Sequence, residues 1–331
     1  MSSERLWSPA FINYGVSSGI FYMTQYVLVA ALPIILTAEL GGTALDAGLA
    51  MTYFQIGTIL CLAVVVLPAS RKGEGINMFA VFSNIAMVLG PAVGLYTLQV
   101  YGSSALYIFL TIMTALAFIL SNVIRLPKEL AKPKQKPSKG WSISQFIEKR
   151  SLPWALMGLF IGFTYSGVLV FIPIELNSMG AGVWGSVFFA LFALMIIISR
   201  PLVGKVYARY GSRFVIYPGV GLFIVGLAIL GVVSTPVGII CTAPLLGLGY
   251  GAAQPAFQAL AVQSAPIERA GVSTATYFLA LDIAVGAGSV ILALIANALG
   301  YQSLYQITSL IMIIALALYH FVIRKHSYIA E

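Results

Sequence analysis

The chain has 331 residues, of which 60% are hydrophobic and only 8% are charged, and its mean hydropathy is +0.97. Soluble domains carry about 25% charged residues, so this composition excludes a water-soluble globular protein. Eighteen Lys and Arg against ten Asp and Glu give a net charge of +8, but the apolar excess leaves no room for a nucleic-acid-binding face. We therefore predict an all-α polytopic protein whose surroundings are a lipid bilayer.

Apolar runs broken by Gly, Pro or charge predict about ten transmembrane helices, since each needs roughly 20 apolar residues. In chain order they cover residues 10–36, 46–69, 77–99, 103–125, 152–176, 183–204, 213–233, 237–263, 271–298 and 302–323. With a cytoplasmic N-terminus, every Lys and Arg falls in or beside a cytoplasmic segment, while Glu39, Asp46 and Glu175 fall in outer loops. This positive-inside bias predicts a multi-pass protein of the cell membrane with both termini in the cytoplasm.

A Pro- and Lys-rich stretch divides the chain into unequal parts. We predict a shortened N-terminal bundle of four helices in residues 1–125, a basic cytoplasmic linker in 126–150 and a six-helix bundle in 151–331. The linker has the composition of a solvated segment, and contact of its lysines with anionic lipid headgroups is the alternative.

The two parts are related by an internal repeat with two different shifts. The aligned pairs are Pro68 with Pro266, Arg71 with Arg269 and Asn84 with Asp282 at a shift of 198, and Thr24 with Thr164 and Pro33 with Pro173 at a shift of about 140. Because the shifts differ by nearly sixty residues, the segment 200–259 has no counterpart in the first part. Its length is that of two helices with their loops.

The stretch Arg200–Arg213, RPLVGKVYARYGSR, resembles the loop motif between the second and third helices of a half in the major facilitator superfamily. The residues of this conformational-loop motif are Arg200, Pro201, Gly204, Arg209, Gly211 and Arg213. Ala208 departs from the pattern, because the family usually has Asp there. The resemblance covers nearly the whole chain and implies two related bundles. We expect this motif to act in conformational change and not to bind substrate.

The first part lacks its own copy of this motif, which belongs directly after Cys61. The second predicted span therefore resembles the start of the family's second helix fused to the end of its fourth. Both of those helices run from outside to inside, so the fusion preserves the orientation of all later spans. Natural shortening, deliberate engineering and a defective gene product are all compatible with the sequence.

Asp282 is the carboxylate nearest the middle of a predicted span. A charge there costs roughly 2.5 to 3.5 kcal/mol, so this side chain is expected to face protein or water. One hypothesis makes it the proton-coupling group. The other makes it a neutral, hydrogen-bonded residue that joins two helices, which its uncharged repeat mate Asn84 allows.

Polar side chains on three predicted spans are candidates for a substrate cavity, because a polar stripe in lipid points inward. They are Ser18, Tyr22, Gln25 and Tyr26 on the first span, Thr164 and Tyr165 on the fifth, and Gln254 and Gln258 on the eighth. The resemblance places these helices around the central cavity of the family. The alternative is hydrogen bonding between helices, or, for the two Gln, bonding to carbonyls freed by Pro255.

The segment LGPAVG, with Gly90, Pro91 and Gly94, resembles the antiporter motif of the family's fifth helix. The match is partial, because Ala86 and Leu95 stand where the family has glycines. An ordinary proline kink is the alternative.

Together these features predict a secondary transporter that works by alternating access, since no Walker-type phosphate-binding motif occurs. No Lys or Arg falls in the centre of a predicted span, which favours lipophilic, cationic or neutral small-molecule substrates. The preferred function is proton-coupled efflux by a monomer without metal or cofactor. A non-transporting remnant or membrane scaffold, and a facilitator for a neutral solute such as a sugar, remain alternatives. The spans contain no paired acid and base, so the sequence does not indicate an enzyme.

Overall fold

The computed structural model describes residues 9–65, 73–123 and 147–323, and all regular structure in these ranges is helical. The elements are α1 (Pro9–Ile34), η1 (Ile35–Glu39), α2 (Ala44–Val65), α3 (Gly73–Val123), η3 (Lys149–Ser151), α4 (Leu152–Ser166), η4 (Gly167–Phe171), α5 (Ile172–Ser178), α6 (Val183–Tyr210), α7 (Arg213–Leu230), α8 (Pro236–Gln263), η5 (Ile267–Arg269), α9 (Ala270–Leu318) and η6 (Tyr319–Ile323). The predicted all-helical architecture is confirmed.

Within the described ranges, 7 helical stretches are long and apolar enough to cross a membrane. They are Gly15–Glu39, Leu89–Ser121, Lys149–Ser178, Val183–Tyr210, Arg213–Leu230, Pro236–Gln263 and Ala270–Phe321. Helices suit lipid because they satisfy their own backbone hydrogen bonds. The total of ten spans and the division into four plus six stay predictions, because α3 and α9 each run through two predicted spans as one element.

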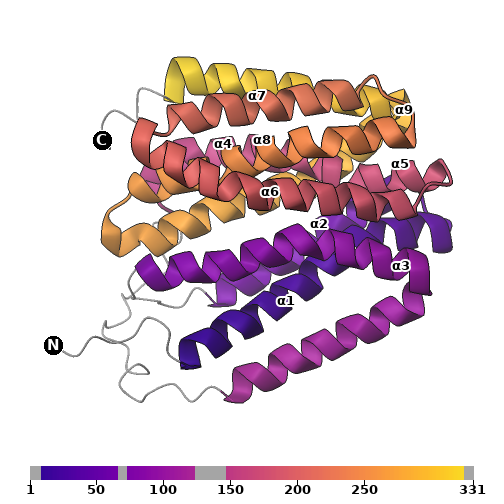
Figure 1. Ribbon diagram of the computed structural model, residues 1–331, viewed down its shortest axis with the longest axis horizontal. Coiled ribbons are helices and arrows are strands. Elements are labelled where there is room, and N and C mark those ends of the chain that lie inside the picture. The colour runs from indigo at the N-terminus through magenta and orange to yellow at the C-terminus, as the bar shows by residue number, and fades with distance from the viewer. Residues whose placement is uncertain (1–8, 66–72, 124–146, 324–331) are drawn as a thin grey trace.

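Both long elements turn at a glycine. Gly102 in α3 has φ 80° and ψ 174°, and Gly300 in α9 has φ 83° and ψ 168°, a left-handed φ that glycine adopts without steric cost. In Figure 1, α3 reverses direction at the end of the molecule opposite the two termini, so its arms run back past each other. The two glycines are separated by 300 − 102 = 198 residues, which equals the shift of the sequence repeat.

The helices pack both within and between the N-terminal and C-terminal sides of the molecule. On the N-terminal side α1 lies against α3, and on the C-terminal side α4 lies against α9 while α8 contacts both α6 and α7 (Figure 1). The largest contacts between the sides are those of α2 with α9 and of α3 with α6. The predicted linker falls mostly outside the described residues, so the boundaries 1–125, 126–150 and 151–331 stay predictions.

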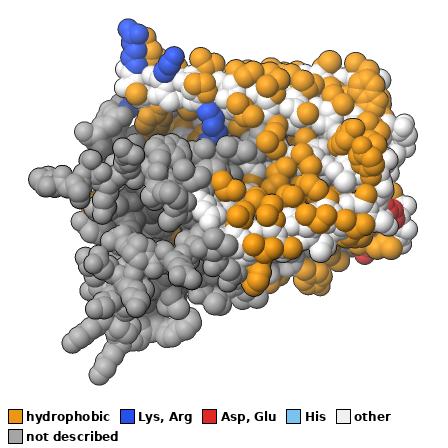
Figure 2. All heavy atoms as spheres, turned by 60° about the horizontal axis from the view of Figure 1, so that its bottom comes forward, with side chains coloured by type: hydrophobic (Ala, Val, Ile, Leu, Met, Phe, Trp, Pro, Cys, Tyr) orange, Lys and Arg blue, Asp and Glu red, His pale blue; other side chains and the backbone are white. Residues whose placement is uncertain are grey.

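The surface agrees with a membrane setting. Figure 2 shows hydrophobic side chains over the described flank, with basic side chains near one end and acidic ones at the other. Apolar residues with exposed side chains, such as Phe118, Ile119 and Leu310, are typical of a surface that faces lipid. Polytopic membrane character is therefore supported by both composition and structure.

Candidate substrate and proton site

Asp282 lies in the first arm of α9 and forms a bond across the two sides of the molecule. The side-chain amide of Gln55 in α2 donates to its Oδ1 at 3.2 Å, and Gln55 is buried while Asp282 is half-buried. Asp282 thus faces another helix of the protein, as expected, because its carboxylate accepts a hydrogen bond from Gln55 of α2. Its partner Gln55 was missed from the sequence, although it is a polar residue within the apolar run MTYFQIGTIL that could have indicated it.

The same interface between α2 and α9 contains two more hydrogen bonds. Thr52 donates to the carbonyl of Gly286 at 2.6 Å, and Ser289 donates to the carbonyl of Gly48 at 2.9 Å. Each bond joins a hydroxyl on one helix to the backbone of the other, which requires close approach of the two helices. Asp282 therefore lies at the edge of a tightly packed contact between the two sides.

A group of tyrosines lies beside this contact. Tyr165 of α4 stacks on Tyr250 of α8 with ring centroids 4.5 Å apart, and both are buried. Tyr26 of α1 is within electrostatic range of Asp282 and of Tyr165, so helices from both sides contribute. Tyr26 and Tyr165 were predicted cavity residues that the structure brings together. Tyr250 was missed, because the sequence GLGYGAAQ drew attention to its glycines instead.

The other predicted cavity residues differ in whether their polar atoms already form hydrogen bonds within the protein. Thr164 is buried and donates to carbonyls of its own helix, at 3.0 Å to Phe160 and to Ile161. Gln254 donates to Gln258 at 3.4 Å. The four candidates of α1 are all half-buried, namely Ser18, Tyr22, Gln25 and Tyr26. Their roles as substrate contacts stay predictions.

The motif Arg200–Arg213 is mostly helical, which corrects the predicted end of its span at residue 204. The helix α6 continues to Tyr210, so Arg200, Pro201, Gly204 and Arg209 all lie within it. Gly211, with φ 86°, ends the helix, and α7 begins at Arg213. Helix continuation moves Arg200 away from the end of the helix, because ten residues follow it to Tyr210 (210 − 200 = 10).

Gly90 and Gly94 bring α3 close to α1. A Cβ placed on Gly90 would meet the Cβ of Tyr26, and one on Gly94 would lie 2.6 Å from the carbonyl oxygen of Val27. Pro91 lies inside α3 between these contacts. The two glycines thus have a packing role beside a candidate site residue, and their role in antiport stays a prediction.

Glu175 was expected in an outer loop, but the structure places it in α5, where it is 4% exposed. Tyr305 of α9 donates to its Oε2 at 3.0 Å. The sequence did not predict this buried carboxylate or its hydrogen bond with Tyr305. Its position two residues after Pro173 at the end of an apolar run suggested a loop.

At the end of the molecule opposite the termini, the two sides also meet through amides. Gln99 of α3 donates to Asn177 of α5 at 3.4 Å. Beside them lies a pocket of about 300 Å³ that also borders Gly182 and Trp184. The two amides pack closely on Gly182, since a Cβ there would lie 2.7 Å from side-chain atoms of both.

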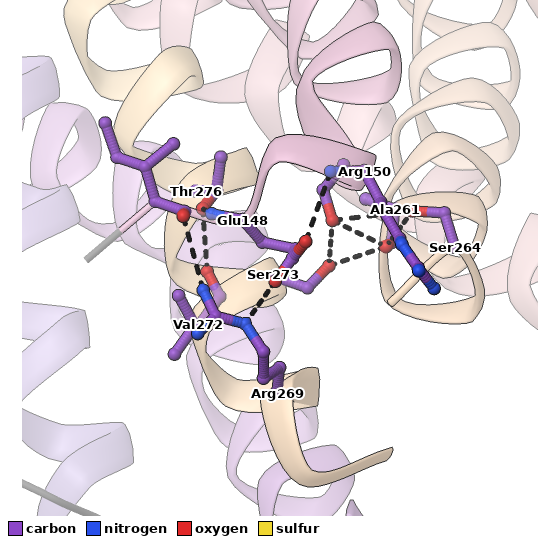
Figure 3. A network of polar contacts seen from close by, with 10 residues as sticks. Glu148, Arg150, Ala261, Ser264, Arg269, Val272, Ser273 and Thr276 are labelled. Carbon is purple, nitrogen blue, oxygen red and sulfur yellow. Dashed lines mark hydrogen bonds and ion pairs between the residues drawn. The ribbon is translucent and has the colours of Figure 1, made fainter. Parts of the chain in front are cut away.

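A polar network at the opposite end fixes the start of α4 (Figure 3). Arg269 forms an ion pair with buried Glu148, and the Glu148 backbone amide donates to Thr276 at 2.9 Å. Burial raises the pKa of the Glu148 carboxyl, but hydrogen bonds from Arg269 and from the Arg150 backbone outweigh this, so its pKa lies below the ordinary value. Ser151 and Ser273 continue the network onto the carbonyl of Ala261 in α8.

Metal chemistry has no candidate site in the part of the chain that the structure describes. No three His, Cys, Asp or Glu side chains gather there in a group that could hold an ion.

These features define a class of protein: a helical membrane protein with a polar junction between two packed sides. The family model of the Major Facilitator Superfamily matches residues 60–289. The chain belongs to this superfamily, and membership argues against an enzymatic role. The predicted recognition of the superfamily is thereby confirmed, as is its coarse function as a transporter.

Relatives in the superfamily are distant in sequence. The Escherichia coli K12 protein YhhS, an MFS-type transporter, is 25% identical over 310 residues, which cover 91% of this chain and 72% of the relative. The Methanocaldococcus jannaschii MFS-type transporter MJ1560 is 22% identical, covering 75% of this chain and 66% of the relative.

Solved structures show the same fold. A mutant form of the nucleoside transporter NupG superposes with a TM-score of 0.70 at 11% identity, covering 93% of this chain and 98% of that one. The bacterial homolog of Spinster, inward-facing and occupied, gives a TM-score of 0.63 at 14% identity and covers 95% and 96%. At this identity the likeness concerns the fold alone.

Proposed function

We propose that this protein is a proton-coupled secondary transporter that exports small lipophilic compounds by alternating access, with Asp282 as the proton-coupling group. The observation that carries the proposal is the bond between Gln55 and Asp282, which joins the N-terminal to the C-terminal side. A change in the protonation of this one carboxyl therefore acts directly on the contact between the two sides. The protein is proposed to act as a monomer in the cell membrane, with both termini in the cytoplasm.

The coupling follows from hydrogen-bond strength. A bond from an amide to an ionised carboxylate is roughly twice as strong as one to a neutral group. Deprotonated Asp282 thus holds Gln55 and keeps α2 on α9, and protonation weakens this hold. Loss of the charge also removes a cost of roughly 2.5 to 3.5 kcal/mol for an ion within the bilayer. The two sides can then move apart in the protonated state, which links a proton to each change of access.

The substrate site is proposed to lie beside this group, between the half-buried residues of α1 and the buried residues of the C-terminal side. Tyr22 and Tyr26 supply amphipathic surface on α1, and Gln254 and Gln258 supply amides on α8. The tyrosine rings favour lipophilic or aromatic compounds.

Flux in liposomes tests the proposal. With an imposed proton gradient, the protein is expected to drive accumulation of a lipophilic dye, and Asp282→Asn is expected to abolish the gradient-driven part while exchange of dye across the membrane continues. Asp46→Asn is the matched control, because Asp46 is exposed at the start of α2. Gradient-driven flux that is undiminished in Asp282→Asn would remove this residue from the mechanism.

A second candidate is a non-transporting remnant or scaffold, and one observation favours it: the match spans 72% of the length of YhhS, consistent with the proposed absence of two helices. The same assay decides between them. No flux of any solute by folded, monodisperse protein supports the remnant. Flux that is independent of the proton gradient and unchanged in Asp282→Asn supports a facilitator for a neutral solute.

A further inference from the structure

Arg200 is a cation inside a membrane-spanning helix. Ten residues separate it from the end of α6 at Tyr210 (210 − 200 = 10), a distance of about 15 Å along the axis. Arg200 is half-buried, and no acidic side chain in the described ranges forms an ion pair with it, since the ion pair found there joins Glu148 and Arg269. The sequence placed no Lys or Arg in the centre of a span and so favoured neutral, lipophilic or cationic substrates, but Arg200 lies deeper in its helix than the predicted end of that span at residue 204 implied.

The crossing of α6 and α8 brings Arg200 to a tyrosine. A Cβ on Gly251 would lie 2.5 Å from the Ser199 hydroxyl and 3.0 Å from the Ile196 Cα, so the two backbones touch at this point. Arg200 follows Ser199, and Tyr250 precedes Gly251. Arg200 and Tyr250 are accordingly within electrostatic range of each other.

The hydroxyl of Tyr250 has no hydrogen-bond partner, although the residue is only 2% exposed. A buried polar group without a partner costs about 1 to 3 kcal/mol. The Tyr250 hydroxyl and the Arg200 guanidinium, two donors on the crossing helices, have no acceptor among the described residues. An anionic oxygen is the ligand that satisfies both, because Arg suits carboxylates and similar groups.

The apolar surroundings indicate the rest of the ligand. Tyr250 stacks on Tyr165 and lies 5.9 Å from Phe192 between ring centroids. It is also within electrostatic range of Tyr26, the half-buried α1 residue of the proposed substrate site. A ligand held at Tyr250 by an anionic group thus extends its body toward aromatic surface.

We infer that Arg200 and Tyr250 form an anion subsite, so that the transported compounds are small lipophilic monoanions such as aromatic carboxylates. This inference rests on the proposed transport function and names its substrate class. Asp282 does not compete for Arg200 as an ion pair, and its hydrogen bond is with Gln55. The two charged groups therefore have separate tasks, one for the proton and one for the substrate.

Binding by the purified full chain in detergent tests the subsite. The probes are 2-naphthoate, its neutral amide 2-naphthamide, and 2-naphthylmethylammonium, followed by naphthyl fluorescence. We expect 2-naphthoate to bind at least about 10-fold more tightly than the amide, because hydrogen bonds to charged groups contribute about 1.5 to 3 kcal/mol. The cationic probe is expected to bind most weakly.

Substitutions assign the preference to the two residues. Arg200→Gln is expected to remove the preference for the acid, Arg200→Lys to keep part of it, and Tyr250→Phe to weaken 2-naphthoate about 3- to 10-fold without changing the amide. Lys205→Gln is the matched control, because it removes a cation from an exposed position of the same helix. Equal binding of acid and amide by the wild type, or an unchanged preference in Arg200→Gln, overturns the inference. If Arg200→Gln does not fold, Tyr250→Phe decides.

The failure of this inference and that of the proposed function give different results. Gradient-driven, Asp282-dependent flux of 2-naphthamide with no preference for the acid refutes the anion subsite alone. Arg200-dependent binding of 2-naphthoate without gradient-driven flux refutes proton-coupled transport and leaves the anion subsite in place.

Discussion

The pair α1 and α3 and the pair α4 and α9 make the same contact in the two halves of the molecule. A Cβ on Gly90 would meet Tyr26, and a Cβ on Gly288 would lie 2.6 Å from the hydroxyl of Ser166. The glycines are related by the shift 288 − 90 = 198, and their partners by 166 − 26 = 140. Both shifts of the sequence repeat therefore recur in one spatial contact, which supports an origin from a duplicated unit.

The two pairs differ in what surrounds them. In the most apolar stretch of Lys149–Ser178, 78% of the residues are buried, against 39% in that of Gly15–Glu39. On the C-terminal side α8 packs on α4, whereas α1 packs mainly on α3 and α2. The same helix contact is thus enclosed in one half and open in the other. This difference supports the proposal that the N-terminal part lacks two helices.

The largest expected effect comes from adding a methyl group at the shared contact. Gly90→Ala is expected to lower the free energy of unfolding by about 2 to 3 kcal/mol, because its Cβ would overlap Tyr26 next to backbone atoms. Gly288→Ala is expected to cost less, about 1 to 2 kcal/mol, since the Ser166 hydroxyl can rotate away. Unfolding in mixed detergent micelles measures both.

The control for this pair is Gly221→Ala in α7, where a Cβ would meet nothing within 4 Å. Alanine is the better helix former by up to about 1 kcal/mol, so this variant is expected to be equal to the wild type or more stable. A Gly90→Ala protein as stable as Gly221→Ala would contradict the close contact of α1 and α3.

The next effect concerns a buried pair that one half has and the other lacks. Tyr305→Phe is expected to lower the free energy of unfolding by about 1 to 3 kcal/mol, because it leaves buried Glu175 without the hydroxyl that donates to it. The repeat mates are Ile35 for Glu175 (175 − 140 = 35) and exposed Tyr107 for Tyr305 (305 − 198 = 107).

Tyr107→Phe is the matched control for this pair. Since Tyr107 is 48% exposed, its substitution is expected to change the free energy of unfolding by less than about 0.5 kcal/mol. Equal effects of the two substitutions, measured in the same micelles, would show that the bond between Tyr305 and Glu175 does not stabilise the C-terminal part.

Much of the fold was accessible from the sequence because lipid imposes a simple rule. Apolar runs must form helices there, so the helical architecture could be predicted from hydropathy and the repeat from spacing, while the superfamily was indicated by the motif Arg200–Arg213. The turns at Gly102 and Gly300 even obey the predicted shift of 198 residues. Helix ends were less accessible, since the basic motif after residue 200 favoured a loop while the backbone continues as α6 to Tyr210.

The site was only partly accessible, because a sequence does not show which helices touch. Asp282 is conspicuous in an apolar run, but nothing local pairs it with Gln55, which lies 227 residues away. Tyr250 acquires its neighbours only through the crossing of α6 and α8. Arg200 was assigned to conformational change from its motif, and its depth in the helix depends on where α6 ends.

The smallest expected effect is a pH dependence at the start of α4. The folded pKa of Glu148 lies below its unfolded value of about 4.3, so the ion pair with Arg269 stabilises the protein above that pH. The contribution is lost as the pH falls through the folded pKa. Because the Arg269 side chain is 38% exposed, we expect less than about 1 kcal/mol at pH 7.

Unfolding of wild type and Glu148→Gln at pH 7, 5 and 3 measures this contribution. The difference between the two is expected at pH 7 and 5 and is expected to shrink at pH 3, whereas a difference that grows toward low pH would contradict the lowered pKa. In the N-terminal part, the repeat mates are Arg71 (269 − 198 = 71) and Ser8 (148 − 140 = 8), which lie outside the described residues. Since Ser8 carries no charge, the repeat supplies no second copy of this pair. The pH dependence therefore tests an ion pair of the C-terminal half that the repeat-related Arg71 and Ser8 cannot form, because Ser8 carries no charge.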